Sequence, residues 1–186
     1  ICELAGKPET RVFAGCDRPL ARKLVTAEHV HGKTGLDGPQ LAAPTMPLQP
    51  QHAVDFLIDT LKRSFASDHI VLSCGGIGGT PDDHTRQAAA QALNRPIVRH
   101  SEAVELIRQR CEESGQPLDE FRLRMADFPE GAGLIPNPYN KIAGFTVGQH
   151  HFVPGFPVMA WPMIDWVLDT LYAQFQHQEI EYKRSL

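Results

Sequence analysis

A short glycine-rich stretch contains the residues whose types and spacing best suit chemistry, because it could bind an anion. The sequence Gly75-Gly76-Ile77-Gly78-Gly79 is followed closely by three polar residues. Four glycines let the backbone turn tightly and approach a ligand with no Cβ in the way, and the free amides of a helix start would point into the same space. We therefore predict a ligand-binding turn made of Gly75, Gly76, Gly78, Gly79, Thr80, Asp82 and Asp83.

The same pattern also has a purely structural explanation. Glycine turns often join strands to helices, and Asp83 could simply close a capping box with Thr80. The stretch fits neither the dinucleotide fingerprint nor the P-loop, because no Lys followed by Ser or Thr comes after the glycines. A phosphate-type site and a structural turn both stay open at this point.

A strand and a helix are predicted to hold this turn in place. Residues 69–74 contain the aliphatic run Ile70-Val71-Leu72, which is typical of a strand buried on both faces. After the glycines, Thr80 is a suitable N-cap and Pro81 suits the first helical position. We therefore predict a strand at residues 69–74 and a helix at residues 81–94.

Two histidine pairs are weaker candidates for chemistry. His29 and His31 alternate in a polar loop at residues 17–49, as some metal ligands do, but no third ligand stands at a fixed spacing. His150 and His151 are adjacent in a predicted strand, where neighbouring side chains point to opposite faces. We therefore predict no metal site.

Composition limits the function classes. The chain has 186 residues, of which 42% are hydrophobic and 22% charged, and its formal net charge is -4. The acidic balance and the scattered Lys and Arg residues argue against nucleic acid as a partner, and no apolar run reaches membrane-spanning length. The four cysteines, Cys2, Cys16, Cys74 and Cys111, are widely spaced and form no CxxC pair. We predict a cytoplasmic protein with reduced thiols that binds neither nucleic acid nor membrane.

Hydrophobic periodicity predicts an α/β fold. A strand at residues 11–16, an amphipathic helix at 50–65 and the strand at 69–74 would form a βαβ unit with parallel strands. Helices at 81–94, from 101 and at 118–125, a loop at 128–141, strands at 142–147 and 151–153, and a helix after Pro162 follow. The predicted architecture is a three-layer α/β/α fold with a mainly parallel sheet and a small β-hairpin extension. Its last helix would turn inward a set of five apolar residues, Ile164, Val167, Leu168, Leu171 and Phe175.

The first part of the chain resembles an internal piece of an inosine-uridine-preferring nucleoside hydrolase. The resemblance covers about residues 1–61 and rests on Phe13-Ala14-Gly15-Cys16, Arg18-Pro19-Leu20, the loop at 29–38 and residues 51–57. It implies that His31 corresponds to a histidine near the nucleobase. The aspartate-rich motif with which that family binds calcium is absent from the sequence, so the hydrolytic water would lack its metal.

The remainder, about residues 63–186, resembles the molybdopterin-binding domain of molybdenum-cofactor biosynthesis and competence-damage proteins. The shared motifs are residues 75–86, Asn137-Pro138, Ala143-Gly144-Phe145 and residues 153–157. The resemblance implies a sheet edge that holds a pterin phosphate in the glycine turn, often within a trimer. It also implies that Asp83 matches an aspartate involved in adenylyl transfer or metal binding. Asn137, Pro154 and Gly155 complete the implied ligand site.

Together the two resemblances predict a hybrid. Residues 1–62 would supply a strand, loop and helix that complete a domain formed with residues 63–186, through engineering or recombination. Both active sites would be incomplete, which favours a protein without robust catalysis and without a required cofactor. One alternative is a binder of molybdopterin, or of another phosphate or sulfate anion, at residues 75–83. A second alternative is a nucleoside hydrolase. We expect no catalytic residue; the candidates that match a family motif are His31 for the hydrolase and Asp83 for the molybdopterin-binding domain. Open sheet edges predict self-association as a dimer or trimer, with exchange of segments.

Overall fold

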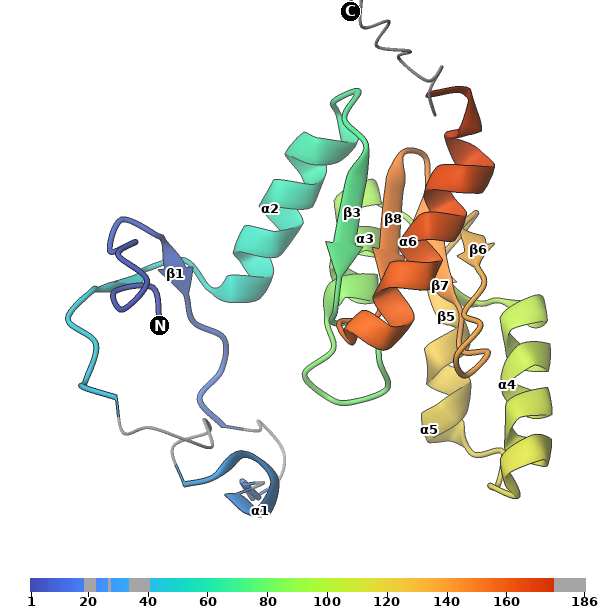
Figure 1. Cartoon of the computed structure of the whole chain (residues 1–186), viewed down its shortest axis with the longest axis horizontal. Helices are drawn as coiled ribbons and strands as arrows, with labels where there is room; N and C mark the ends of the chain where they lie inside the picture. The colour runs from blue at the N-terminus through green and yellow to red at the C-terminus, as the bar shows by residue number, and fades with distance from the viewer. Residues whose placement is uncertain (19–22, 27, 34–40, 176–186) are drawn as a thin grey trace, which may run out of the picture. The chain divides into compact units, whose positions relative to one another are not determined.

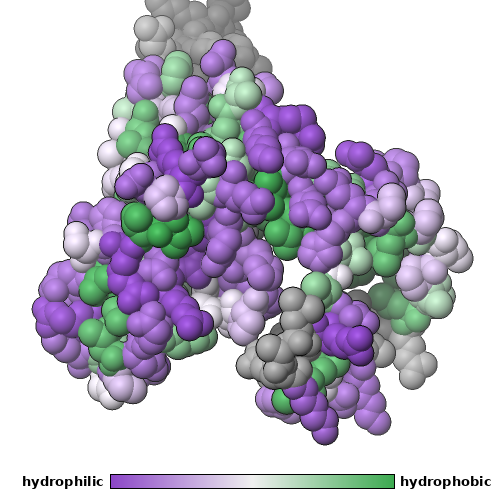
Figure 2. Space-filling view, turned by 180° about the vertical axis from the view of Figure 1, so that it is seen from behind, coloured by the Kyte–Doolittle hydropathy of each residue, from purple (hydrophilic) through white to green (hydrophobic). Residues whose placement is uncertain are grey.

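The fold is described from a computed structural model, which describes residues 1–18, 23–26, 28–33 and 41–175. The described chain divides into two compact units, Ile1–Phe56 and Leu57–Leu186. No helix within these described ranges is both long enough and apolar enough to cross a membrane. Figure 2 shows one face of the protein, on which hydrophilic residues surround smaller apolar groups.

The first unit contains little regular structure. Strand β1 (Val12–Phe13) pairs in parallel with β2 (Leu48–Gln49), and α1 (Glu28–His31) is a single turn. The rings of Phe13 and Phe56 stack with centroids 3.7 Å apart. Phe56 belongs to helix α2 (Ala53–Phe65), which confirms the helix predicted at 50–65.

The second unit is built on a four-stranded mixed sheet. Its strand order is β3 (Val71–Cys74), β8 (His150–Val153), β7 (Gly144–Val147) and β6 (Gly133–Ile135). Strands β3 and β8 are parallel, whereas β8–β7 and β7–β6 are antiparallel. A second sheet pairs β4 (Ile97–Arg99) with β5 (Asp127–Pro129) in antiparallel fashion.

Helices surround these sheets and confirm the predicted α/β class. They are α3 (Thr85–Leu93), α4 (Ser101–Ser114), α5 (Glu120–Leu123), α6 (Pro157–Leu171) and the 3-10 turns η1 (Arg124–Ala126) and η2 (Ala173–Phe175). In Figure 1, α6 lies in front of the four-stranded sheet and α3 behind it. Between them, the buried rings of Phe128, Phe145 and Phe152 form a continuous aromatic row.

Several predictions about strand pairing are wrong. Residues 11–16 do not pair with residues 69–74, because β1 pairs with β2 and β3 pairs with β8. The sheet is not mainly parallel, since only its β3–β8 pair is. The predicted hairpin at 142–153 exists, but it supplies β7 and β8 to the main sheet rather than an extension. Strand β3 is the edge strand of its sheet and pairs with β8 alone, while β1 pairs with β2.

Other predicted elements have different bounds or exposure. Residues 128–141 contain β6 and the end of β5, not only loop. Strand β3 is not buried on both faces, since Leu72 is 41% exposed. Helix α6 begins at Pro157, five residues before Pro162, which is tolerated inside the helix. The inward prediction is correct for Val167, which is buried together with Ala160 and Met163. Ile164 is half-buried, whereas Leu168, Leu171 and Phe175 are exposed.

Candidate functional site

The two parallel strands end at the same edge of the sheet, where two turns meet. Strand β3 runs into Gly75, and β8 runs into Pro154 and Gly155. The Gly75 amide donates to the carbonyl of Val153 at 2.8 Å, and a Cβ placed on Gly155 would lie 3.4 Å from the Gly75 Cα. The structure therefore brings together Gly75 and Gly155, two predicted site residues that are 80 positions apart in the chain (155 − 75).

Three of the other glycines in the turn are required by packing within the protein. A Cβ on Gly76, whose φ is +68°, would lie 2.2 Å from Thr85 Oγ1. A Cβ on Gly78 would lie 2.6 Å from Asp83 Oδ2, and one on Gly79 would lie 3.1 Å from the ring of Phe121. The space freed at these positions is thus filled by the protein itself. Gly75 has more room, since a Cβ placed on it would lie 3.8 Å from the Gly155 Cα, and its φ of +99° is suited to glycine.

The Thr80–Asp83 pair closes a turn rather than starting a helix. Asp83 Oδ2 accepts from the Thr80 amide at 2.9 Å and from the Thr80 hydroxyl at 2.5 Å, and the Asp83 amide donates to the Thr80 carbonyl. Helix α3 begins only at Thr85, whose amide donates to the Gly76 carbonyl. The predicted N-cap at Thr80 is therefore wrong, and Asp82 and Asp83 precede the helix. Of the capping box, only the bond from the Thr80 amide to the Asp83 carboxylate forms, because the Asp83 amide donates to the backbone carbonyl of Thr80 and not to its hydroxyl.

A buried arginine beneath the turn was not predicted. Arg86 is 3% exposed; its Nη2 donates to the Gly78 carbonyl at 2.5 Å, and its Nη1 donates to the Arg124 carbonyl. Burial lowers the pKa of the Arg86 guanidinium, and the charges of Asp127 and Asp83 act in the opposite direction. Among the described residues, its buried Nε has no hydrogen-bond partner. The side chain therefore fixes the turn and places a positive charge beneath it.

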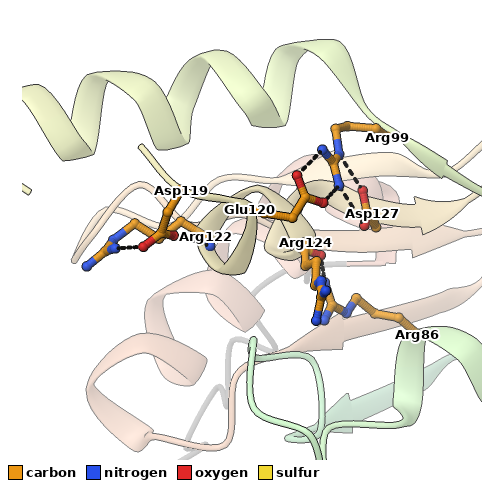
Figure 3. Close-up of polar contacts among 7 residues, drawn as sticks. All are labelled: Arg86, Arg99, Asp119, Glu120, Arg122, Arg124 and Asp127. Carbon is orange, nitrogen blue, oxygen red and sulfur yellow. Dashed lines mark hydrogen bonds and ion pairs between the residues drawn. The ribbon is translucent and has the colours of Figure 1, made fainter. Parts of the chain in front are cut away.

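A second arginine holds the elements on which Arg86 rests. Arg99 forms two hydrogen bonds to each of two carboxylates, with Asp127 of β5 (2.8 and 3.2 Å) and with Glu120 of α5 (2.7 and 3.2 Å), as Figure 3 shows. Asp119 caps α5 by accepting from the Arg122 amide at 2.9 Å. This cluster positions α5, and with it Phe121, against Gly79. Because Phe121 is 49% exposed, its ring is accessible for stacking beside the turn.

Asn137 does not join the glycine turn. Its buried amide donates to Asn140 Oδ1 and to the Ile142 carbonyl, and its own oxygen accepts from the Tyr139 amide. It lines a separate, half-open hollow of about 430 Å³ between α4, α6 and the loop after β6, together with Leu106, Pro136, Pro138, Lys141, Pro162 and Trp166. Asn137 therefore stabilises its own loop and contributes to a different cavity from the one predicted.

The adjacent histidines of β8 are both buried and bonded to hydroxyls. His150 Nε2 lies 2.5 Å from Ser64 Oγ, while His151 lies 2.8 Å from Thr146 Oγ1 and 2.7 Å from Tyr172 Oη. Burial, with a smaller effect from the neighbouring His150, lowers the pKa of His151 to about 4. These neutral imidazoles complete the polar contacts of the core. The side chain of the other histidine candidate, His31, lies outside the described residues.

The described residues contain no group of three or more His, Cys, Asp and Glu side chains arranged to hold a metal ion. The turn places the exposed ring of Phe121 and the buried guanidinium of Arg86 near the carboxyl ends of a parallel strand pair, whereas the amides of Gly75, Thr80 and Asp83 are bonded within the protein. Such an edge is where α/β proteins bind small molecules.

Two protein families match parts of this chain. The probable molybdopterin binding domain matches residues 51–173, and the chain belongs to that family. The inosine-uridine preferring nucleoside hydrolase family also matches, over residues 1–78, so the two matches overlap at residues 51–78. Both resemblances inferred from the sequence are thus confirmed as family matches.

Individual relatives agree with the first of these families. A CinA-like protein of Anaeromyxobacter dehalogenans is 37% identical over 119 residues, covering 61% of this chain and 29% of the relative. A putative competence-damage inducible protein of Lacticaseibacillus casei is 33% identical over 135 residues, covering 70% of this chain and 33% of the relative. The matched part therefore spans about a third of the length of these relatives.

A solved structure supports the fold. The crystal structure of the protein CinA, of unknown function, from Thermoplasma acidophilum aligns with a TM-score of 0.55 and 23% identity. The alignment covers 62% of this chain and 70% of that one. At this identity the likeness supports the α/β fold alone.

Proposed function

We propose that the second unit binds a small molecule that carries a phosphate group, of which molybdopterin is one example, at the turn formed by residues 75–83. The observation that carries the proposal is the meeting of Gly75 and Gly155 where the parallel strands β3 and β8 end. Membership of the molybdopterin-binding family supports the same class of ligand.

Two positive features near the turn favour a phosphate ligand, and they lie beside the carboxylates of Asp82 and Asp83, which belong to the same turn. Helix α6 begins at Pro157, directly after the Gly155 turn, so the positive end of its dipole lies at this edge. The buried guanidinium of Arg86 adds a full positive charge under Gly78. Asp83 is held by Thr80 and directs its carboxylate to that residue. The role of Asp83 in this proposal is therefore to hold the turn in shape.

We expect the ligand to contain an aromatic ring as well as a phosphate group. Phe121 is half-exposed and packs on Gly79, so a flat ring attached to the phosphate could stack there. A pterin phosphate and a nucleotide both have this combination.

Calorimetric titration tests the proposal. The full chain is titrated with a nucleotide, with the matching phosphate-free nucleoside and with inorganic phosphate. We expect saturable binding of the phosphate-bearing compound and at least about tenfold weaker binding of the nucleoside, because about 1.4 kcal/mol of phosphate contacts is lost. Asp83→Ala should weaken binding by a similar factor, since it releases Thr80.

Asp68→Ala is the matched control, because Asp68 is exposed and lies before β3, away from the turn in sequence. It should leave the affinity unchanged. Equal affinity for nucleoside and nucleotide, or an Asp83→Ala variant that binds like the parent chain, contradicts the proposal.

Other predictions stay as they were made from the sequence. The comparisons give no support to an engineered or recombined origin, so the hybrid stays a prediction. Nucleoside hydrolysis rests on a match to less than half of the chain, and a ribose-release assay tests it. Self-association and the cytoplasmic location also stay predictions; light scattering tests the first.

A further inference from the structure

The first unit contains a thiol and an imidazole within hydrogen-bond distance. Cys16 Sγ lies 3.6 Å from His52 Nε2, although the residues are 36 positions apart in sequence. Cys16 follows β1 and is exposed, and His52 directly precedes α2. The Ala53 amide donates to the Ala14 carbonyl at 2.8 Å, which keeps the two segments together. The pair is thus held by the backbone and is open to solvent.

The backbone also determines which nitrogen of His52 carries the proton. The Val54 amide donates to His52 Nδ1 at 3.2 Å, so Nδ1 must be an acceptor. In the neutral ring the proton then resides on Nε2, the nitrogen that faces Cys16. His52 therefore presents an N–H donor to the sulfur, which is the nucleophilic atom of cysteine.

We propose that Cys16 is a reactive thiol, activated by His52, and that it is a site of oxidation by hydroperoxides. The sulfur attacks one peroxide oxygen, the O–O bond breaks, and the departing hydroxide takes up a proton to become water. Cys16 is oxidised by two electrons to sulfenic acid, and the peroxide is reduced by the same two electrons. This inference is independent of phosphate binding in the second unit.

The other cysteines provide internal comparisons. Cys74 is also exposed, but no hydrogen bond to its sulfur occurs within the described ranges. Cys111 is buried in α4, and Cys2 is intermediate in exposure. If exposure alone governed reactivity, Cys16 and Cys74 would react alike.

The test measures all four thiols in the full-length chain at the same time. The protein is treated with a limiting amount of iodoacetamide at pH 7, and the rate at each cysteine is read by peptide mass spectrometry. We expect Cys16 to react about tenfold faster than Cys74, because one hydrogen bond to a charged sulfur has an effect of this order. With one equivalent of hydrogen peroxide, dimedone should trap sulfenic acid at Cys16 before Cys74.

The variant His52→Asn separates activation from structure. Asparagine can still cap α2 by accepting from the Val54 amide, but its side chain is too short to reach Cys16. We expect the rate at Cys16 to fall to that of Cys74, with the rate at Cys74 unchanged. Equal rates at Cys16 and Cys74 in the parent chain, or a Cys16 excess that survives in His52→Asn, would overturn the proposal.

Discussion

Different kinds of interaction stabilise the interior of each of the two units. Among the described residues, the buried hydrophobic side chains all belong to Leu57–Leu186, where Phe145, Phe152 and Met163 are fully enclosed. In Ile1–Phe56 the main contacts are polar or half-exposed. The Glu3 carboxylate accepts hydrogen bonds from the Thr45 and Met46 amides. The rings of Phe13 and Phe56 stack on each other. The Cζ atom of Arg11 lies 5.7 Å from the centroid of the Phe13 ring and 5.8 Å from that of the Phe56 ring.

This difference predicts separate stabilities. Burial of apolar surface stabilises by roughly 25 cal/mol per Å², whereas water competes for exposed polar contacts and leaves each a small net effect. The second unit should therefore unfold cooperatively, and the first should open at lower cost. The proposed phosphate site lies in the stable unit, and the Cys16–His52 pair lies in the weaker one.

Truncating one aromatic ring in each unit gives the largest contrast. Phe145→Ala should destabilise the second unit by about 3–5 kcal/mol, because it removes the middle ring of a fully buried row. Phe13→Ala should cost the first unit only about 1 kcal/mol, since that ring is half-exposed. Both tryptophans, Trp161 and Trp166, lie in the second unit, so their fluorescence during urea unfolding reports that unit alone.

Hydrogen exchange of the backbone amides gives a separate measurement for the first unit. Phe13→Ala should speed exchange at the β1 and β2 amides and leave the fluorescence midpoint in place. A common shift of both observables by either variant would mean that the units unfold as one, and would remove the distinction between them.

Acid should destabilise the two units in different pH windows. The pKa of His151 is about 4 in the fold, below its ordinary 6.5, so the stability it gives is complete above pH 6.5 and is lost as the pH falls toward 4. With about 1.4 kcal/mol per pKa unit, the loss is at most about 3 kcal/mol. His150 acts in the same direction, since burial lowers its pKa as well.

The first unit should respond at lower pH. Hydrogen bonds from the Thr45 hydroxyl and the backbone amides lower the pKa of Glu3 below 4.5. Its contribution is therefore present above pH 4.5 and lost only below it.

Urea midpoints followed by tryptophan fluorescence between pH 7.5 and 4.5 should fall in the parent chain and stay flatter in His151→Gln. The same slope in both proteins would show that His151 is not the cause.

Local patterns in the sequence predicted much of this structure. The amphipathic pattern of residues 50–65 predicted α2, and the strands predicted at 142–147 and 151–153 are present as the β7–β8 hairpin. The glycine turn after β3 was also predicted at the right position. In each case the signal comes from residues that are neighbours in the chain.

What the sequence did not predict depends on distant partners. Nothing within residues 69–74 specifies β8 as the neighbour of β3, because an aliphatic strand accepts many partners. Arg86 was missed since a charged residue in a helix is usually exposed, and here the carbonyls of Gly78 and Arg124 make its burial favourable. Asn137 was assigned to the glycine turn by motif order alone, whereas its bonds are local.

A matched pair of glycine substitutions gives the smallest and sharpest test of the difference between the units. Gly6 and Gly76 have nearly the same φ, +67° and +68°, but a Cβ on Gly6 meets nothing within 4 Å, whereas one on Gly76 meets Thr85 Oγ1 at 2.2 Å. Gly6→Ala should cost about 1 kcal/mol from backbone strain alone. Gly76→Ala should cost about 2–3 kcal/mol, because overpacking adds to that strain, and it should weaken nucleotide binding as well.

Removing the obstructing hydroxyl completes the argument. In a Thr85→Ala background, the added cost of Gly76→Ala should fall toward the value for Gly6→Ala, as a double-mutant cycle measured by urea unfolding would show. Recovery of nucleotide binding in the double variant would mean that the packing of Gly76 on Thr85 sets the shape of the turn. If Gly6→Ala and Gly76→Ala cost the same in the parent chain, the turn is as loosely packed as the first unit, and the contrast between the two regions does not extend to the proposed site.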